Sequence, residues 1–537
     1  MSLRPTRPAR FLARVCVVAA AGVGAYHLVL EWRALTLREP MGIWESYYIS
    51  LSRHWANLYE RGHFTDALGL YGPVYPATVR PLLAAGFEPY LAHRLAAFLA
   101  LLAACGLVAF YLRTKGVRGH VIAAIVSIIY CLNAGTYSIM ARPDFLLVAE
   151  AYLLLFLGER MARGGRPQPG ESVLLGLLAL VGYLTKPYAL LAWATAAGYL
   201  ALGCGIWSPA LISGGIIAAG IGLYALTHYY FWLDTFKFLQ SQTALEAAAF
   251  VAQTRDFAVL SGGLLAAALF ARPWAKGRGA RPDYWLFATL AGGLPLLYLG
   301  FHAGAYLTYY LHLLLPPLSI LAALRIQEAV EGGRRWWLPV FLAANLAVLA
   351  YWAPPLPTAD PGWDSMASDM ARQKGLVVGS WITEPLTRTR GNLELTGDGI
   401  TPLAVTFPFR LPGADPVLVA ARQEANTELC RLTQPLIGPG HPAAIYLEGI
   451  VLRMSPAQYV AVKQQQPELL MIPFDQPDLP DRVFVARENL GAIRRALLSA
   501  YQPQAYFDVR PYYIGTNYAR QTAGSRHAAI LKLVPKS

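Results

Sequence analysis

The stretch LAHRLAAFLALLAACGLVAFYL, residues 91–112, decides the fold of this chain. After Arg94, near its start, it contains no Lys, Arg, Asp or Glu. A helix needs about twenty predominantly apolar residues to cross the roughly 30 Å hydrocarbon core of a bilayer. The stretch therefore predicts a helix that spans a membrane.

Segments of the same kind follow one another through most of the chain. Segments 145–158 and 173–186 are short, so each either extends into its flanks or stops partway across the membrane against neighbouring protein. The chain is 55% hydrophobic and 14% charged, whereas an average soluble domain has about 25% charged residues. The sequence predicts an all-α polytopic membrane domain of about eleven helices. Beside 91–112, the segments centre on residues 12–31, 120–139, 145–158, 173–186, 188–205, 209–228, 256–271, 284–301, 305–324 and 336–352.

The positions of Lys and Arg predict how these helices are oriented. The formal net charge is +13, but the basic residues lie between apolar segments and do not form the single patch of a nucleic-acid-binding protein. The basic N-terminus and first segment suit a cleaved signal peptide or an uncleaved anchor, and continuation of the segment to Trp32 favours the anchor. An anchor places the N-terminus in the cytoplasm, together with the basic loops 113–118, 159–166, 272–281 and 325–335.

The cysteines help to predict the compartment. The five cysteines form no CxxC pair, and four of them lie inside apolar segments, so neither a disulfide framework nor a zinc site is indicated. Together with the short loops and the lack of an organelle signal, this favours a bacterial inner membrane.

The composition changes after residue 352. A Pro-rich linker occupies residues 353–362, and no later run is long enough to span a membrane. Short β-rich runs alternate with helical stretches, which predicts a soluble α/β or α+β domain. We therefore expect a membrane domain over 1–352 and a periplasmic domain over 353–537. The β-rich runs are 375–379, 444–447 and 482–486, and the helical stretches are 456–465 and 489–501.

The first outer loop, residues 33–90, offers a candidate general base. Residues 45–58 fit a helix that lies along the membrane surface, with aromatic side chains at the headgroup level. Glu45, beside Tyr47 and Tyr48, would then sit where water meets lipid. A carboxylate there can take a proton from a hydroxyl that arrives from the aqueous side. The alternative is a glutamate that is merely solvated.

Charged residues also lie at the outer ends of the helices. Arg142 and Asp144 come at the start of one apolar segment, and Lys186 comes at the end of the next. Ionisable groups at such depth are costly and are therefore functional or paired. Arg and Lys suit a phosphate held at the membrane surface. The alternative is that Asp144 pairs with Arg142 or Lys186 and holds helices together.

Two further groups belong to the same outer face. His302 lies in an aromatic cluster with Tyr306, Tyr309 and Tyr310, which suits a sugar or a prenyl phosphate or else forms only an aromatic belt. Arg94 follows His93 at the outer start of segment 91–112, where an arginine can also simply snorkel to water. Six residues from separate parts of the chain thus reach one face, which predicts a site: Glu45, Arg94, Arg142, Asp144, Lys186 and His302.

The order of these motifs resembles that of the GT-C membrane glycosyltransferases, the superfamily that holds the protein O-mannosyltransferases and the aminoarabinose transferases of lipid A. The resemblance covers about residues 1 to 352. It rests on Trp-Glu-Ser-Tyr-Tyr (44–48), Tyr-Gly-Pro-Val-Tyr-Pro (71–76), His-Arg-Leu (93–95), Arg-Pro-Asp (142–144), Thr-Lys-Pro (185–187) and Tyr-Tyr-Leu-His-Leu-Leu-Leu-Pro-Pro (309–317).

The resemblance implies a hexosyl or pentosyl transferase at the outer face of the inner membrane. Such an enzyme moves a sugar, with inversion, from a polyprenyl-phosphate donor to a glycan, lipid or protein acceptor. Glu45 would be the base, and Lys186 with Arg142 or Arg94 would hold the donor phosphate. The remaining substrate contacts would come from Tyr47, Tyr71, Tyr75, Asp144, His302, Tyr306 and Tyr309.

The sequence departs from the family pattern in three respects. Family members usually carry Asp in the first loop, so the base is alternatively Asp66. The usual Thr-Lys-Gln appears here as Thr-Lys-Pro. Some members need a divalent metal, so a divalent metal is possible here as well, but the first loop holds no clustered carboxylates beyond Glu45, Glu60 and Asp66 to support it.

Two other functions are compatible with many membrane helices. A secondary transporter has a similar number, but it places ionisable groups near mid-membrane and often has repeated halves. Here the polar groups lie at one face, no half is duplicated, and the chain ends in a large outer domain. An export scaffold with a working C-terminal domain is the third reading, and residues 353–537 contain no nucleophile motif, phosphate loop or metal signature that favours it.

Overall fold

The computed structural model describes the helices, part of the first outer loop and a C-terminal sheet. The described residues are 7–37, 45, 48–49, 52, 72–137, 142–165, 167–227, 247–270, 283–300, 307–333, 337–352, 359–374, 377–379, 443–452, 500–509 and 526–536.

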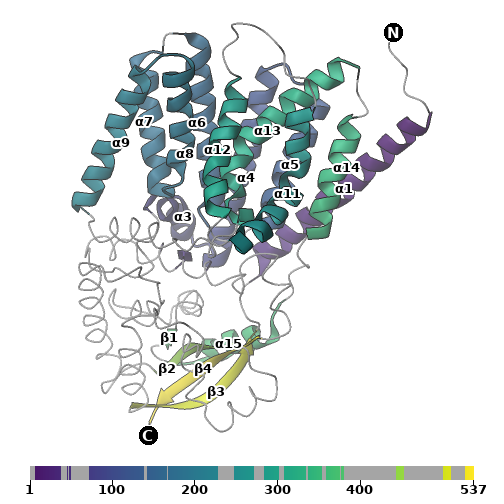
Figure 1. The fold of residues 1–537 in the computed structure, drawn as a ribbon. Coiled ribbons are helices and arrows are strands. Elements are labelled where there is room, and N and C mark those ends of the chain that lie inside the picture. The colour runs from purple at the N-terminus through teal and green to yellow at the C-terminus, as the bar shows by residue number, and fades with distance from the viewer. Residues whose placement is uncertain are drawn as a thin grey trace.

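Each of the eleven predicted apolar segments is a helix, and these helices pack side by side in one bundle (Figure 1). The two short segments extend into their flanks: α6 continues past the end of the run 145–158, and α7 begins before the run 173–186. The helices are α1 (Arg7–Thr36), α4 (Pro89–Thr114), α5 (Gly119–Tyr137), α6 (Asp144–Gly164), α7 (Pro169–Thr185), α8 (Ala189–Gly198) with the π-helical turn η2 (Tyr199–Gly203), α9 (Ser208–Thr227), α11 (Ala247–Phe270), α12 (Tyr284–Gly300), α13 (Leu307–Glu331) and α14 (Trp337–Trp352).

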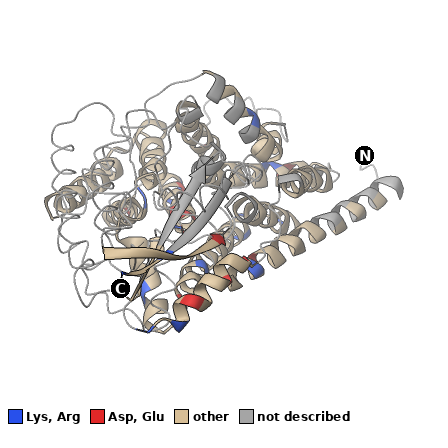
Figure 2. Cartoon of the chain, turned by 90° about the horizontal axis from the view of Figure 1, so that it is seen from below, with Lys and Arg blue, Asp and Glu red and all other residues tan. Residues whose placement is uncertain are grey.

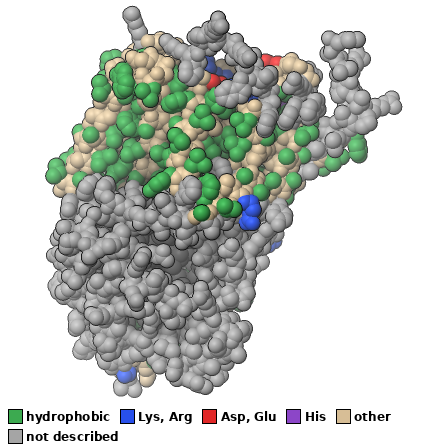
Figure 3. Space-filling model, in the orientation of Figure 1, with side chains coloured by type: hydrophobic (Ala, Val, Ile, Leu, Met, Phe, Trp, Pro, Cys, Tyr) green, Lys and Arg blue, Asp and Glu red, His purple; other side chains and the backbone are tan. Residues whose placement is uncertain are grey.

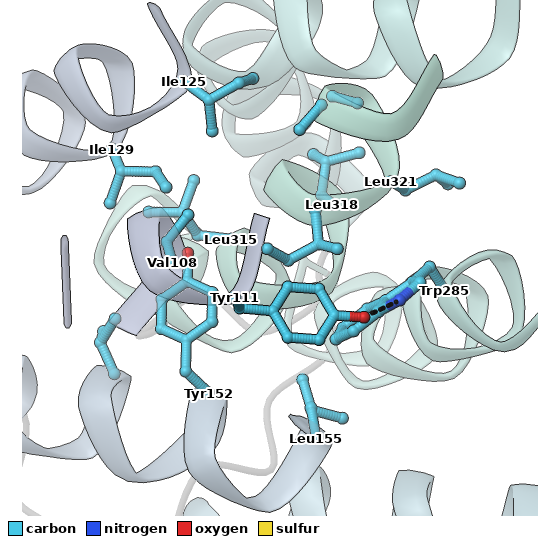
Figure 4. Packing of buried hydrophobic residues seen from close by; sticks show 14 of the residues in the cluster. Val108, Tyr111, Ile125, Ile129, Tyr152, Leu155, Trp285, Leu315, Leu318 and Leu321 are labelled. Carbon is cyan, nitrogen blue, oxygen red and sulfur yellow. Dashed lines mark hydrogen bonds between the residues drawn. The ribbon is translucent and has the colours of Figure 1, made fainter. Parts of the chain in front are cut away.

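Aromatic and branched side chains fill the space between the helices (Figure 4). The ring of Tyr111 stacks on Phe156, with centroids 4.0 Å apart, and Trp285 Nε1 donates a hydrogen bond of 3.0 Å to the Tyr111 hydroxyl. The Tyr152 hydroxyl shares a hydrogen bond of 2.8 Å with Ser319. Because buried polar tips find partners inside the bundle, these aromatic residues stabilise the core without a desolvation penalty.

The outside of the bundle is also apolar. Leu226 is 85% exposed and Phe110 is 71% exposed, and Figure 3 shows hydrophobic side chains covering the side of the bundle, with charged ones near its edges. In the described part of the chain, α4 and α9 are long and apolar enough to cross a membrane by length and composition, and six shorter apolar helices accompany them. Whether the chain crosses a membrane eleven times stays a prediction.

A short helix, α3 (Val74–Ala84), lies at the lower end of the bundle (Figure 1). Below it are α15 (Pro361–Arg372) and the strands β1 (Val377–Gly379), β2 (Ala444–Leu452), β3 (Tyr501–Val509) and β4 (Arg526–Pro535). Seen from below, the strands cross the end of the bundle (Figure 2).

The strands form a mixed sheet of order β1-β2-β4-β3, in which β1 pairs parallel to β2 and the other pairs are antiparallel. Helix α15 packs against β3 and buries Trp363. Asp369 of α15 accepts a hydrogen bond from Tyr446 (2.6 Å) and pairs with Lys532 (2.9 Å). Burial raises the pKa of Asp369, but the two hydrogen bonds outweigh it and leave this pKa below its usual value.

The C-terminal part agrees only in part with the prediction from sequence. The run 375–379 contains β1, and the run 444–447 is the first part of β2. Tyr501 ends a predicted helical stretch, but in the structure it begins β3. The last residues of the predicted linker, 361–362, belong to the first turn of α15. Sheet pairing with β4 decides the state of 501–509, and no local pattern reports that partner. The runs 456–465 and 482–486 lie outside the described residues.

Candidate active site

A buried ion pair joins the first outer loop to the bundle. Arg94 donates from Nε and Nη2 to the two oxygens of Glu45, both at 2.7 Å, and neither side chain is exposed. Arg94 Nη1 donates to the carbonyl oxygens of Ala34 (2.7 Å) and Leu37 (2.5 Å) at the end of α1. The guanidinium therefore binds the carboxylate in a bidentate manner and fixes the end of α1 at the same time.

The start of α4 explains why Arg94 reaches this place. Glu88 accepts a hydrogen bond from the amide of Leu91 (2.9 Å), and Pro89 occupies the first turn, so the helix begins with a side-chain cap. Arg94 then lies one turn inside the helix, and its guanidinium lies 5.2 Å from the centroid of the Tyr90 ring.

The sequence led us to expect Glu45 at the boundary between water and lipid. In the structure, Glu45 is buried inside the protein instead. Four positions of stretch 45–58 are described, and all four are helical and buried in the protein: Glu45, Tyr48, Ile49 and Ser52. The prediction of a helix is confirmed at these four positions. The prediction that Glu45 and Tyr48 lie at the boundary between water and lipid is wrong, because both are buried in the protein. The physical reason is that Arg94 supplies a buried partner for the carboxylate, which no sequence pattern reveals.

A second ion pair joins α6 to the end of α7. Lys186 Nζ lies 2.5 Å from Asp144 Oδ1, and both side chains are buried. Lys186 follows the last helical residue of α7 and is extended, with φ −162° and ψ 127°, because the residue before a proline avoids helical dihedrals. Asp144 is the first residue of α6, where the positive end of the helix dipole favours a carboxylate.

Tyr75 of α3 connects the two ion pairs. Its hydroxyl shares a hydrogen bond of 3.2 Å with His93 Nδ1, and its ring contacts that of Tyr48 edge to face. Burial first, and then the carboxylates of Glu45 and Asp144, raise the pKa of the Tyr75 hydroxyl well above its usual value, whereas Arg142 lowers it. One carboxylate from each pair, together with Arg142, therefore lies close enough to shift the pKa of this hydroxyl.

Close packing of the backbone holds α3 at this position. A Cβ atom added to Gly72 would lie 2.0 Å from the carbonyl oxygen of Leu184. Gly72 thus lies directly against the end of α7, two residues before Lys186. Only glycine allows this approach, which explains why the segment carries Gly72.

One buried carboxylate beside the site was not predicted from sequence. Glu150, two turns into α6, accepts a hydrogen bond of 2.7 Å from Thr185 Oγ1. Its second oxygen, Oε2, has no hydrogen-bond partner among the described residues. A lone Glu within an apolar run, six residues after Asp144, was the signal that would have identified it.

The structure thus brings together six of the predicted site residues: Glu45, Tyr75, Arg94, Arg142, Asp144 and Lys186. The alternative that Asp144 pairs with Lys186 is observed as well. Tyr309 belongs to α13, but its side chain is not described. Asp66, Tyr47, Tyr71, His302 and Tyr306 lie outside the described residues. Within the described part of the chain, no three His, Cys, Asp or Glu side chains are grouped so as to hold a metal ion.

Comparison with known proteins identifies the fold. No protein-family model and no curated protein sequence matches the chain. Among solved structures, the chain is similar to ArnT from Cupriavidus metallidurans bound to undecaprenyl phosphate, with 14% sequence identity and a TM-score of 0.50 over 95% of this chain and 97% of that one. The apo state of the same ArnT gives 14% identity and a TM-score of 0.49 over the same shares. The chain therefore has a fold similar to that of this ArnT, over nearly its whole length.

Proposed function

We propose that this protein is a membrane glycosyltransferase that takes its sugar from a polyprenyl-phosphate donor. The observation that carries the proposal is the buried cluster of three cations and two carboxylates around Tyr75, at one end of a bundle with the ArnT fold. The ArnT structure contains undecaprenyl phosphate, and we infer a ligand of the same class for this chain. The acceptor is a glycan, lipid or protein that reaches the site from the outer face of the membrane.

The lipid phosphate is bound by Lys186 and Arg142. Arg offers a fork of donors and Lys a compact charge, and Arg142 lies just before α6 whereas Lys186 lies just after α7. Arg94 is an alternative phosphate ligand, but it makes four hydrogen bonds to Glu45, Ala34 and Leu37. We therefore assign Arg94 to orient Glu45. Desolvated cations in such a site stabilise charge as the glycosyl bond breaks.

The transfer step follows from these positions. The acceptor hydroxyl loses its proton to a carboxylate, its oxygen attacks the anomeric carbon, and the bond from that carbon to the phosphate oxygen breaks. Polyprenyl phosphate leaves with the electron pair, and the anomeric configuration inverts. Glu45 is the proposed base, because its carboxylate and that of Asp144, the partner of Lys186, both act on the Tyr75 hydroxyl. Asp66 is the second candidate for the same role.

Transfer from a panel of radiolabelled polyprenyl-phosphate sugars to lipid and glycan acceptors tests the proposal. We expect wild-type protein in detergent to transfer label, Lys186→Ala to lose donor binding and transfer, and Glu45→Gln to lose transfer by about 100-fold or more while it still binds donor. Glu159→Gln is the control, since Glu159 is a buried carboxylate paired with Lys115 at 2.8 Å far from the site.

The other outcomes separate the alternatives. If only Asp66→Asn abolishes transfer, the function stands and Glu45 is not the base. If wild-type protein neither binds nor consumes any donor, the glycosyltransferase proposal is wrong, and substrate uptake into proteoliposomes becomes the assay to run, because a secondary transporter is the main rival.

A further inference from the structure

The two cations with a described ion-pair partner in the site are not held in the same way. Arg94 makes four hydrogen bonds from three nitrogens, two of them to backbone carbonyls of α1. It cannot leave Glu45 without also releasing the end of α1. Lys186 has a flexible stem of four carbons and meets Asp144 at a single carboxylate oxygen. A compact ammonium group on such a stem can turn from one oxygen to another without moving a helix, so we expect a ligand to exchange with the second pair.

The Lys186–Asp144 pair opposes binding of an anion. Both side chains are buried, at 0% and 6% exposure, so the attraction between them is little screened by water. A phosphate that approaches Lys186 must replace this carboxylate or share the ammonium group with it. Part of the binding free energy of the phosphate is then spent on separating the pair.

The carboxylate has support when it gives up Lys186. Asp144 begins α6, so the partial positive charge at the helix N-terminus remains beside it. Arg142 lies two residues earlier and acts on the same Tyr75 hydroxyl as Asp144 does. These groups lower the cost of separating the pair, so that the exchange is reversible and does not trap a buried, unpaired charge.

We propose that Asp144 is a built-in competitor of the lipid phosphate for Lys186, and that it returns to Lys186 to expel the polyprenyl phosphate product. The inference rests on the proposed function. Donor binding moves Lys186 from the Asp144 carboxylate to the donor phosphate, and no covalent bond changes. The donor is a phosphodiester with one negative charge, whereas the product is a monoester with about −1.5 to −2 at pH 7. The product therefore binds the cations more tightly than the donor, and competition by Asp144 favours its release.

The direction in which an Asp144 variant changes the affinity for polyprenyl phosphate tests this role. We expect Asp144→Asn to bind it about 10-fold more tightly than wild type, because the amide carries no charge to compete for Lys186. In the same variant, steady-state turnover should be slower than in wild type and should follow a burst of product, since product release becomes limiting. The measurement is binding of labelled polyprenyl phosphate to purified protein, followed by single-turnover and steady-state transfer.

Three variants serve as controls. In the Lys186→Ala background, where we expect binding to be lost, Asp144→Asn should not restore it, because the cation for which Asp144 competes is absent. Glu159→Gln removes the charge of a buried carboxylate paired with a lysine elsewhere in the bundle and should leave the affinity unchanged. If Asp144→Asn does not stay folded by size-exclusion chromatography, Asp144→Ser makes the same test.

The outcomes distinguish the inference from the proposed function. If wild type binds polyprenyl phosphate and Asp144→Asn binds it equally or more weakly, Asp144 organises the site instead of competing, and the inference is overturned while the function stands. If wild type does not bind polyprenyl phosphate at all, both the function and the inference are wrong.

Discussion

At the scale of single residues, the site depends on short contacts between neighbouring helices. Thr185 and Lys186 are adjacent in sequence, and both reach α6, where Thr185 contacts Glu150 and Lys186 contacts Asp144. The threonine therefore helps to fix the position of the lysine. Its hydroxyl also gives the buried Glu150 carboxylate a hydrogen-bond donor.

Substitution of Thr185 by Val should destabilise the protein. The change preserves the shape but leaves the buried carboxylate of Glu150 without this donor, which costs about 1–3 kcal/mol. We expect a lower Tm by scanning fluorimetry and weaker donor binding, since Lys186 loses its neighbouring contact. Thr227→Val is the matched control, because Thr227 donates to the Leu223 carbonyl on an exposed part of α9. Equal losses in both variants would contradict this role of Thr185.

At the scale of elements, α1 carries two ionisable residues in its buried face. His27 and Glu31 are one turn apart and are 0% and 1% exposed, whereas Leu28 and Trp32 on the other face are 56% and 69% exposed. None of the four polar side-chain atoms of His27 and Glu31 has a hydrogen-bond partner in the described part of the chain. Helix α1 packs against α14, α5 and α4.

Removing the polar group of Glu31 should stabilise the bundle. A buried polar group without a partner costs about 1–3 kcal/mol, so Glu31→Leu should raise the Tm of the detergent-solubilised protein. Glu159→Leu should lower the Tm, because it leaves Lys115 without its carboxylate. A lower Tm in both variants would mean that Glu31 has a partner in the folded protein. A higher Tm together with loss of transfer would make Glu31 part of the function.

At the scale of the whole molecule, the position of the sheet defines the two ends of the bundle. Helix α15 and the strands lie at the end where α3 lies, and the N-terminus lies at the opposite end (Figure 1). The sequence predicts the same division, with basic loops at the cytoplasmic end and residues 353–537 in the periplasm. The candidate active site would then open to the periplasmic face.

Cysteine labelling in intact cells tests this orientation. In a variant whose five native cysteines are replaced, a membrane-impermeant maleimide should label Asp364→Cys on the exposed face of α15. It should not label Arg118→Cys, at the start of α5, until the cells are opened. The opposite pattern would place the site in the cytoplasm and rule out an acceptor from the outer face.

The sequence by itself determined the helical bundle. Runs of about twenty apolar residues leave the backbone only one way to satisfy its hydrogen bonds in a bilayer, which is a helix. All eleven segments are helices for this reason. The sequence also singled out Glu45, Arg94, Arg142, Asp144 and Lys186, because charged residues at the ends of apolar runs are costly unless they serve a purpose.

Only the tertiary structure decided how those charges are paired. The partners Glu45 and Arg94 are 49 residues apart, and Asp144 and Lys186 are 42 apart. No periodicity relates positions so distant, because a pairing across helices depends on how the helices pack. The same holds for β3, which took its state from β4, and for Gly72, which the backbone of Leu184 requires to be glycine. The type and position of these residues in the sequence identified them as candidates, and the packing of the helices decided which of them pair.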